Sequence, residues 1–257
     1  DDGDIDADAA LDFLKRYLAL IHCDLFFADA AILIEGTVER LLLPQMIMKT
    51  SPNLNTKYLT TLDVGVAYAH RFAELMTFLH IPYLVITDID SVKPPEGGGR
   101  AKACCAVDAG AVTSNASLKD MFAGKLLISD FNEIPAQDQK QTDLDRFVAF
   151  QRPVSVDFLG ENIMVHGRTL EETFIYENIQ FFSEGEAFKS VVLPTVAEEL
   201  NQSMYELIRE SSFKKTDFAL TVLSSDAWQA PLYIREGLEW LEQRLQSQDQ
   251  ANEEEVI

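Results

Sequence analysis

The sequence predicts an α/β protein built on a parallel sheet, and three observations lead to that prediction. Short apolar runs that suit buried strands lie at residues 31–34 and 82–87, and residues 59–66 alternate loosely in the manner of a further strand. Segments with apolar residues at helical spacing separate them, over residues 37–49 and 67–80. Strands that alternate with helices in this way form parallel sheets through right-handed crossovers. Two of the strand candidates are apolar throughout, which is typical of strands covered on both faces.

The remaining segments are predicted to be mostly helical. Residues 9–27 have apolar positions at helical spacing, so an amphipathic helix is expected before the first strand. Two short strands, either side of Gly160, are expected as a hairpin or a strand pair at residues 154–158 and 163–166. The amphipathic segments that follow are residues 175–182, 196–209, 218–223 and 231–245. We expect an α/β core with insertions at residues 25–175, helical elements at 1–24 and 176–250 on or beside it, and a disordered acidic tail at 251–257.

Bulk properties narrow the class of protein. The 257 residues can bury an ample core, and a composition of 47% apolar and 25% charged residues is ordinary for a globular protein. No apolar run is long enough to cross a bilayer, so no membrane contact is expected. Three cysteines, two of them adjacent, make no disulfide framework and favour a reducing cytoplasm. The acidic start without Met predicts a fragment of a longer chain.

The formal net charge of −21 bears on possible partners. Such a protein repels a phosphate backbone at long range, so alone it would be a poor nucleic-acid binder. Either it does not bind nucleic acid, or metal ions and another domain supply the attraction.

Acidic residues follow two of the predicted strands. Glu35 ends the first strand, Glu39 lies in the first turn of the next helix, and Asp88 and Asp90 end the third strand. Open α/β sheets place their ligands at the carboxyl ends of strands. Residues i and i+2 of an extended segment share a face, so the two aspartates are expected to project together. Gathered carboxylates repel unless cations lie between them, and oxygen ligands suit Mg²⁺ or Mn²⁺.

Simpler interpretations remain open for each piece. Glu35 could cap the helix, and the aspartate pair could be a solvated loop. The basic residues of the Pro/Gly-rich segment 92–103, Arg100 and Lys102 among them, could contact a phosphate backbone or form an ordinary surface loop. Its glycines do not follow a strand in the frame of a dinucleotide fingerprint, which we reject.

Several motifs together resemble a known family. Residues 33–39 (LIEGTVE), with Leu43 and Pro44, and residues 87–91 (TDIDS) resemble the Toprim domain of primases, type IA and II topoisomerases and OLD-family nucleases. Further features are similar to the OLD family: Phe26, Phe27 and Ala28; the second Glu four residues after the first; Thr169, Leu170 and Glu171; and residues 213–220 and 231–238. One departure is Val38, where many relatives have an acidic or polar residue.

The resemblance implies a Rossmann-like Toprim sheet with an additional helical subdomain, acting as a metal-dependent DNA nuclease. It implies that an amino-terminal ATPase domain of the same polypeptide is absent here, so ATP would act only through that domain. A homodimer, a helicase-like partner and a role in defence against phage are the further expectations.

The resemblance also suggests roles for single residues in two-metal catalysis, with ions about 3.5–4 Å apart. Glu35, Asp88 and Asp90 are expected to hold one ion. Glu39 and Glu171 are expected to hold the second, because Glu172 is assigned to a capping box with Thr169. Lys215 is expected to stabilise the phosphate in the transition state. Lys214 is the alternative, a solvated helix-end cation is the simpler interpretation of either lysine, and Arg100, Lys102 and Lys214 are the expected substrate contacts.

Two competing functions stay open. A topoisomerase or primase would use the same acids, but the former needs a nucleophilic tyrosine in a separate DNA-binding domain, and Tyr233 lies in a helical segment without one. A non-enzymatic module would instead dock a partner protein through its acidic helical tail.

Overall fold

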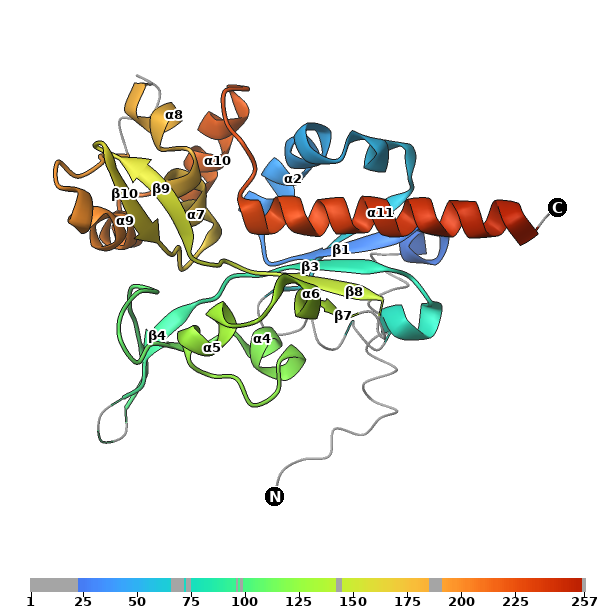
Figure 1. Cartoon of the computed structure of the whole chain (residues 1–257), viewed down its shortest axis with the longest axis horizontal. Coiled ribbons are helices and arrows are strands. Elements are labelled where there is room, and N and C mark those ends of the chain that lie inside the picture. The colour runs from blue at the N-terminus through green and yellow to red at the C-terminus, as the bar shows by residue number, and fades with distance from the viewer. Residues whose placement is uncertain are drawn as a thin grey trace.

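A five-stranded sheet forms the centre of the computed structural model, which describes residues 23–65, 72, 75–95, 97, 99–141, 145–184 and 191–255 (Figure 1). Its strands, in spatial order, are β2 (Leu59–Asp63), β1 (Ala30–Ile34), β3 (Tyr83–Ile86), β8 (Arg146–Ala149) and β7 (Lys140–Gln141). The first four run parallel, and β7 is antiparallel to β8. The predicted α/β class with a parallel sheet is confirmed; strand β8 was not predicted.

The sheet is covered on both faces. All five residues of β1 are buried. Because side chains alternate along a strand, Ile32 and Ile34 join one hydrophobic core while Ala31 and Leu33 join the other. An apolar run without polar alternation is therefore what this position in the sheet requires.

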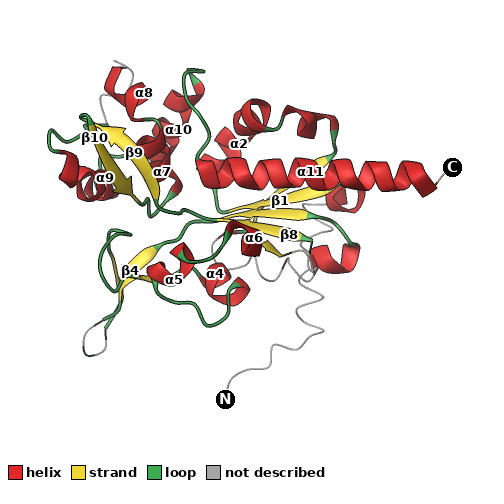
Figure 2. Ribbon diagram, in the orientation of Figure 1, coloured by secondary structure: helices red, strands yellow, loops and turns green. Residues whose placement is uncertain are grey.

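Different helices cover the two faces (Figures 1 and 2). Helices α2 (Thr37–Thr50) and α11 (Leu232–Glu255) lie on one side, and α4 (Ala116–Met121) and α5 (Ile128–Asn132) lie on the other. A short helix α6 (Ala136–Gln139) precedes β7, and a 3₁₀ turn (Pro52–Thr56) follows α2. Of the helix predicted at 67–80, residues 75–79 are helical and part of the remainder lies outside the described residues.

Helix α11 approaches the sheet closely at Gly237. A Cβ atom there would lie 2.5 Å from Leu84 Cδ1 and 3.4 Å from Ala149 Cβ, so the backbone of α11 packs directly on β3 and β8. The predicted disordered tail at 251–257 is wrong as far as Glu255, because α11 continues to that residue. An ion pair between Lys57 and Asp249 (2.5 Å) and a run of good helix formers support the extension.

The chain after β8 builds a smaller unit beside the sheet (Figure 1). The predicted hairpin is confirmed as β9 (Val154–Phe158) and β10 (Glu161–Val165), paired antiparallel. The predicted helices appear as α7 (Leu170–Glu177), α8 (Ile179–Glu184), a 3₁₀ turn (Ala197–Glu199), α9 (Leu200–Arg209) and α10 (Lys215–Leu223). Phe174, Phe182, Phe218 and Trp228 form one aromatic cluster in this unit, with ring centroids 5.3–6.2 Å apart.

A small antiparallel sheet leaves the other side of the core. It consists of β5 (Lys102–Ala103), β4 (Ser91–Lys93) and β6 (Val112–Thr113), in that order. The predicted loop 92–103 is thus an arm whose two ends pair as strands. The helix predicted at 9–27 falls largely on residues 1–22, which lie outside the described residues; Cys23–Phe27 form a 3₁₀ turn.

None of the helices that the structure describes is both long and apolar enough to cross a bilayer.

Candidate active site

Glu35 stands directly after β1, and one of its carboxylate oxygens is held by three donors. Oε1 accepts hydrogen bonds from the backbone N–H of Asp88 (2.9 Å), from Asn115 Nδ2 (2.9 Å) and from the Thr87 hydroxyl. Among the described residues no hydrogen bond engages Oε2. Glu35 is therefore fixed in orientation with one oxygen left for a ligand.

Asp88 follows β3 and is tied in the same manner. Its side chain is buried, and Oδ1 accepts hydrogen bonds from Gln151 Nε2 (2.6 Å) and from the Leu170 backbone N–H (3.0 Å). Both donors are neutral groups. Oδ2 takes part in no hydrogen bond between described residues.

Asp90 is placed differently from the prediction. Strand β3 ends at Ile86, and Asp90 has a φ of 47°, so the argument from an extended segment with Asp88 and Asp90 on one face is wrong. The left-handed backbone is held by the Arg168 carbonyl, which accepts from the Asp90 N–H (3.2 Å). Asp90 Oδ1 pairs with Arg168 Nη2 at 2.7 Å. The two contacts with Arg168, rather than strand geometry, therefore fix the position of Asp90.

The two remaining acids come from the helices that follow the strands. Glu39 lies in the first turn of α2, and Glu171 lies in the first turn of α7 with 1% exposure. Glu171 accepts a hydrogen bond from the Thr169 hydroxyl (2.8 Å). The predicted capping box is wrong in detail, because Glu172 accepts from the backbone N–H of Arg168 rather than from that of Thr169.

The electrostatics show that these carboxylates lie close together. Burial, with smaller contributions from Asp90 and Glu39, raises the pKa of Glu35 to about 7. Burial raises the pKa of Asp88 well above its usual range, and Glu35, Glu39, Asp90 and Glu171 raise it further. Burial and the nearby Glu171 also raise the pKa of Glu39. Glu35, Glu39 and Asp88 thus lie where burial and the neighbouring acids disfavour the charged form of the carboxylate.

This donor set fits a hard divalent cation in kind. It offers oxygen atoms only, its members are buried or half-buried, and Glu35, Asp88 and Asp90 each have one oxygen bound to the protein. Within the described part of the chain, however, no three His, Cys, Asp or Glu side chains stand close enough together to hold a metal ion as they are.

The two candidate lysines occupy different places. Lys215 begins α10, and its Nζ lies 3.0 Å from Glu171 Oε1. Burial alone would lower the pKa of Lys215, but Glu171 and Asp88 outweigh it and raise that pKa. Lys214 Nζ instead donates to the carbonyl of Ser211 (2.6 Å) at the surface. Of the two, Lys215 faces the acids.

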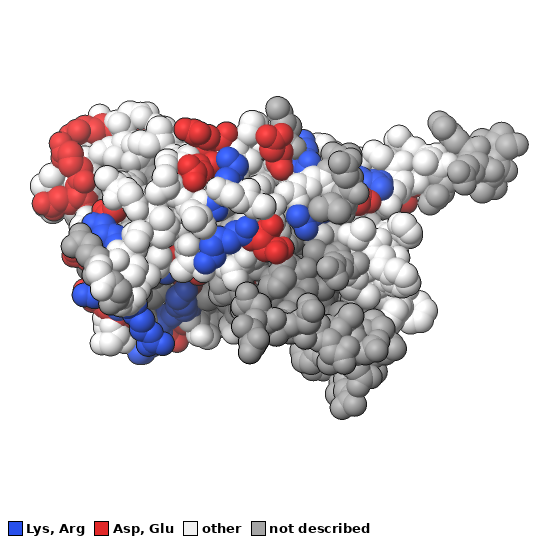
Figure 3. All heavy atoms as spheres, turned by 90° about the horizontal axis from the view of Figure 1, so that it is seen from below, with Lys and Arg blue, Asp and Glu red and all other residues white. Residues whose placement is uncertain are grey.

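The predicted substrate contacts Arg100 and Lys102 are exposed and lie on the arm between β4 and β5. Figure 3 shows lysine and arginine side chains spread over this face of the molecule, with acidic side chains among them.

Three residues of the site were not predicted as such: Asn115, Gln151 and Arg168. Asn115 caps α4 by accepting from the Leu118 N–H (3.1 Å). Gln151 lies two residues beyond β8. Had that strand been predicted, its end would have placed Gln151 at the same edge of the sheet.

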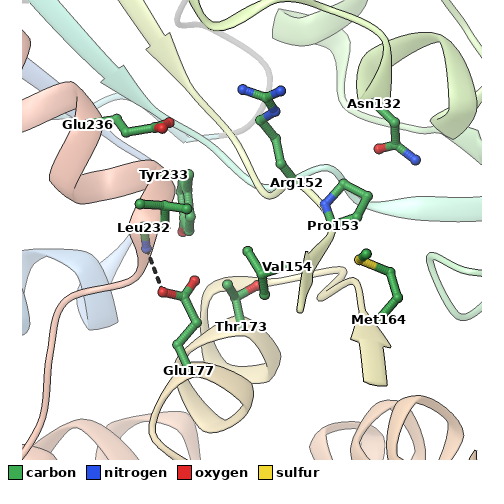
Figure 4. Close-up of a pocket in the computed structure, with 10 residues that line it drawn as sticks. All are labelled: Asn132, Arg152, Pro153, Val154, Met164, Thr173, Glu177, Leu232, Tyr233 and Glu236. Atoms are coloured by element: carbon green, nitrogen blue, oxygen red, sulfur yellow. Dashed lines mark hydrogen bonds between the residues drawn. The ribbon is translucent and has the colours of Figure 1, made fainter. Parts of the chain in front are cut away.

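A cavity of about 320 Å³ is lined by residues of β9, α7 and α11, among others (Figure 4). Tyr233 forms part of its wall, is 3% exposed, and accepts a hydrogen bond from Gln151 Nε2 (3.2 Å), the same nitrogen that binds Asp88. None of the predicted site residues lines this cavity. The remaining lining residues are Asn132, Arg152, Pro153, Val154, Met164, Thr173, Glu177, Leu232 and Glu236.

Comparisons with known proteins support the resemblance seen in the motifs. Residues 26–90 match the family model of the Overcoming lysogenization defect protein-like TOPRIM domain. Endonuclease GajA of Bacillus cereus (strain HuB5-5) is 25% identical over 264 residues, which cover 93% of this chain and 35% of that protein. The chain therefore spans about a third of the length of this curated relative.

Solved structures of similar arrangement come from OLD proteins. The C-terminal region of the Xanthomonas campestris pv. campestris OLD protein is 18% identical with a TM-score of 0.49, covering 89% of this chain and 99% of that one. The C-terminal region of the Burkholderia pseudomallei OLD protein is 18% identical with a TM-score of 0.47, covering 85% and 99%. The matched residues 26–90, which include Glu35, Asp88 and Asp90, are similar to the TOPRIM domain of OLD-like proteins.

Proposed function

We propose that this chain is the catalytic part of a DNA endonuclease that depends on Mg²⁺ or Mn²⁺. The observation that carries the proposal is the group of buried and half-buried carboxylates that follow β1 and β3, of which Glu35, Asp88 and Asp90 each have one oxygen bound to the protein. The match to the OLD-like Toprim model and the similarity to an endonuclease support it.

Each predicted ligand has a role in this proposal. Glu35, Asp88 and Asp90 would hold one ion, and Glu39 and Glu171 would hold a second. Two ions at such a site supply an activated water and neutralise the leaving oxygen. Thr87 and Gln151 orient the first two carboxylates, which restricts the number of arrangements that the ligands can adopt.

Lys215 supplies a positive charge beside the acids. Its side chain is half exposed while its ammonium group is bound to the buried Glu171, so it borders both the acids and the solvent from which a phosphate would approach. A fixed cation at this point would stabilise the charge that develops on the phosphate. Tyr233 is buried against Gln151, and this burial disfavours the topoisomerase alternative, which needs an accessible nucleophile.

DNA contact is assigned to Arg100, Lys102 and Lys214, which are exposed. Because the chain carries a net charge of −21, these residues would hold DNA only with help. We assign that help to the rest of a longer polypeptide, including an ATPase domain through which ATP would act. Homodimerisation, a helicase-like partner, a role in phage defence and a cytoplasmic location belong to the same proposal.

A divalent-ion titration against supercoiled and linear DNA tests the proposal. Wild-type protein should nick or cut in Mg²⁺ or Mn²⁺ and should stop when a chelator is added. Asp88→Ala should remove the activity while circular dichroism shows an unchanged fold. Retained cutting by purified Asp88→Ala would sink the assignment, as would calorimetry that detects no Mn²⁺ binding to the wild type.

A further inference from the structure

Asn115 connects a helix end with two acids of the site. Its side chain is fully buried, with 0% exposure. The Nδ2 atom lies within hydrogen-bond distance of Glu35 Oε1 (2.9 Å), Thr87 Oγ1 (2.7 Å) and the Asp88 carbonyl oxygen (2.7 Å). The other end of the amide, Oδ1, accepts from the Leu118 N–H and caps α4. One side chain thus joins β1, the segment after β3 and α4.

We propose that Asn115 is a positioning residue that keeps Glu35 Oε1 bound to the protein, so that Glu35 binds an ion through Oε2 alone. The inference rests on the proposed function and assigns a role to a residue that contacts no substrate. Three donors already surround Oε1, and a carboxylate oxygen in that position has little capacity left for a cation. A ligand held in one orientation also loses less conformational freedom when it binds.

The segment around Asn115 is built as a brace for residues 88–90. Thr113 Oγ1 donates to the Ile89 carbonyl (2.6 Å), and the Asn115 N–H donates to Thr113 Oγ1 (3.0 Å). The Ser114 N–H and hydroxyl both donate to the Asp90 carbonyl (3.0 and 2.9 Å). Leu118, one turn into α4, is fully buried in the second core. The position of Asn115 is therefore fixed from both sides, which a residue that orients another must be.

Helix capping is the competing explanation for Asn115, and one substitution separates the two roles. Serine is also a good N-cap residue, so Asn115→Ser keeps an oxygen for the Leu118 N–H but removes the amide donor to Glu35. Asn178→Ser is the matched control. Asn178 is a buried asparagine at the C-terminal end of α7, the opposite end from Glu171. Its Nδ2 donates to the carbonyls of Phe174 (2.9 Å) and Gln229 (3.0 Å) rather than to an acid of the site.

The measurement is Mn²⁺ affinity by isothermal titration calorimetry, with the thermal unfolding midpoint recorded for each protein. Loss of a group that orients a metal ligand costs about 10–100-fold in affinity, so Asn115→Ser should weaken Mn²⁺ binding by at least about 10-fold. Asn178→Ser should bind Mn²⁺ as the wild type does, although both variants lose some thermal stability.

The outcomes separate this inference from the proposed function. If the wild type neither binds Mn²⁺ nor cuts DNA, the proposed function fails and the inference with it. If the wild type does both and folded Asn115→Ser equals it in Mn²⁺ affinity, the inference alone is overturned. Should Asn115→Ser not fold, Thr87→Val removes a different donor from the same oxygen. Thr87→Val should then also weaken Mn²⁺ binding, and an unchanged Mn²⁺ affinity would overturn the inference.

Discussion

Four of the five acids of the site fall into two pairs, which the protein holds with different kinds of partner. Glu35 and Asp88 are held by neutral donors: Asn115, Thr87 and Gln151. Asp90 and Glu171 are held by cations, Arg168 at 2.7 Å and Lys215 at 3.0 Å. The first pair has raised pKa values because burial penalises its charge and no cation contacts it.

The difference indicates what each pair contributes to ion binding. The neutral-held pair is oriented but electrostatically unsatisfied, so an incoming cation would relieve a penalty that folding has imposed. The cation-paired acids are already neutralised, so an ion there must compete with a side chain. Active sites commonly store strain of this kind at the expense of stability.

The largest effect is expected for Asp88→Asn. An amide oxygen still accepts from Gln151 and Leu170, but the charge is gone, so Mn²⁺ binding and DNA cleavage should be lost. The metal-free protein should become more stable by about 1 kcal/mol, or ~2–4 °C in the unfolding midpoint. Calorimetry with and without Mn²⁺ measures both. Asp90→Asn should bring no such gain, because Arg168 loses its partner; equal stabilisation by the two variants would contradict the division into pairs.

Lys215→Met tests the cation-paired side. Removing a charge that stabilises the reacting phosphate should lower the cleavage rate by about 10²–10³-fold. Mn²⁺ binding should persist, because Glu171 is released from its ion pair. Lys214→Met is the control. As an assigned DNA contact it should weaken DNA binding, but at saturating DNA it should cut at close to the wild-type rate, since Lys214 Nζ lies on the Ser211 carbonyl and not on the acids. A rate loss confined to Lys214→Met would reverse the assignment of the two lysines.

His166 lies next to the pair of acids that neutral donors hold. Its Nε2 lies 3.2 Å from the carbonyl of Gln151, the residue that holds Asp88, and burial lowers its pKa from 6.5 to about 4. The unfolded chain takes up a proton near pH 6.5 and the folded chain only near pH 4. Stability from this group is therefore complete above pH 6.5 and is lost as the pH falls toward 4, by up to about 3 kcal/mol.

Urea unfolding at pH 7.5 and 4.5 measures this loss for the wild type against His166→Gln. The variant lacks the titrating ring, so its stability should fall less over this interval. Parallel losses in the two proteins would show that His166 does not titrate as its burial requires.

The smallest effect is expected for Arg168→Gln. Arg168 and Asp90 are partly exposed, with side-chain exposures of 17% and 19%, so the pair is worth only about 1 kcal/mol. Without the competing charge, Mn²⁺ affinity at low salt should rise slightly. A loss as large as that expected for Asn115→Ser would show that Arg168 orients Asp90 and that the two pairs are less different than their contacts indicate.

The sequence predicted the parts of the site that depend on local pattern. Glu35 and Asp88 follow apolar runs, and those runs are strands because they are buried on both faces. Asp90 lies near Asp88, but the predicted extended backbone that would place it there is wrong. Its left-handed backbone is held by hydrogen bonds with residues 114 and 168. Asn115 and Gln151 could not be assigned, because their partners lie 80 and 63 residues away in the chain.

Gly237 has a consequence that reaches beyond packing. Without a side chain at this position, α11 rests directly on Leu84, and Tyr233 lies one turn earlier on the same helix. The tyrosine oxygen meets Gln151, so the depth at which a helix settles onto the back of the sheet helps to determine where a carboxylate stands at its edge. One added methyl group at Gly237 would push α11 away from Leu84. Tyr233 would move with the helix, and the position of Gln151 beside Asp88 would change as a result.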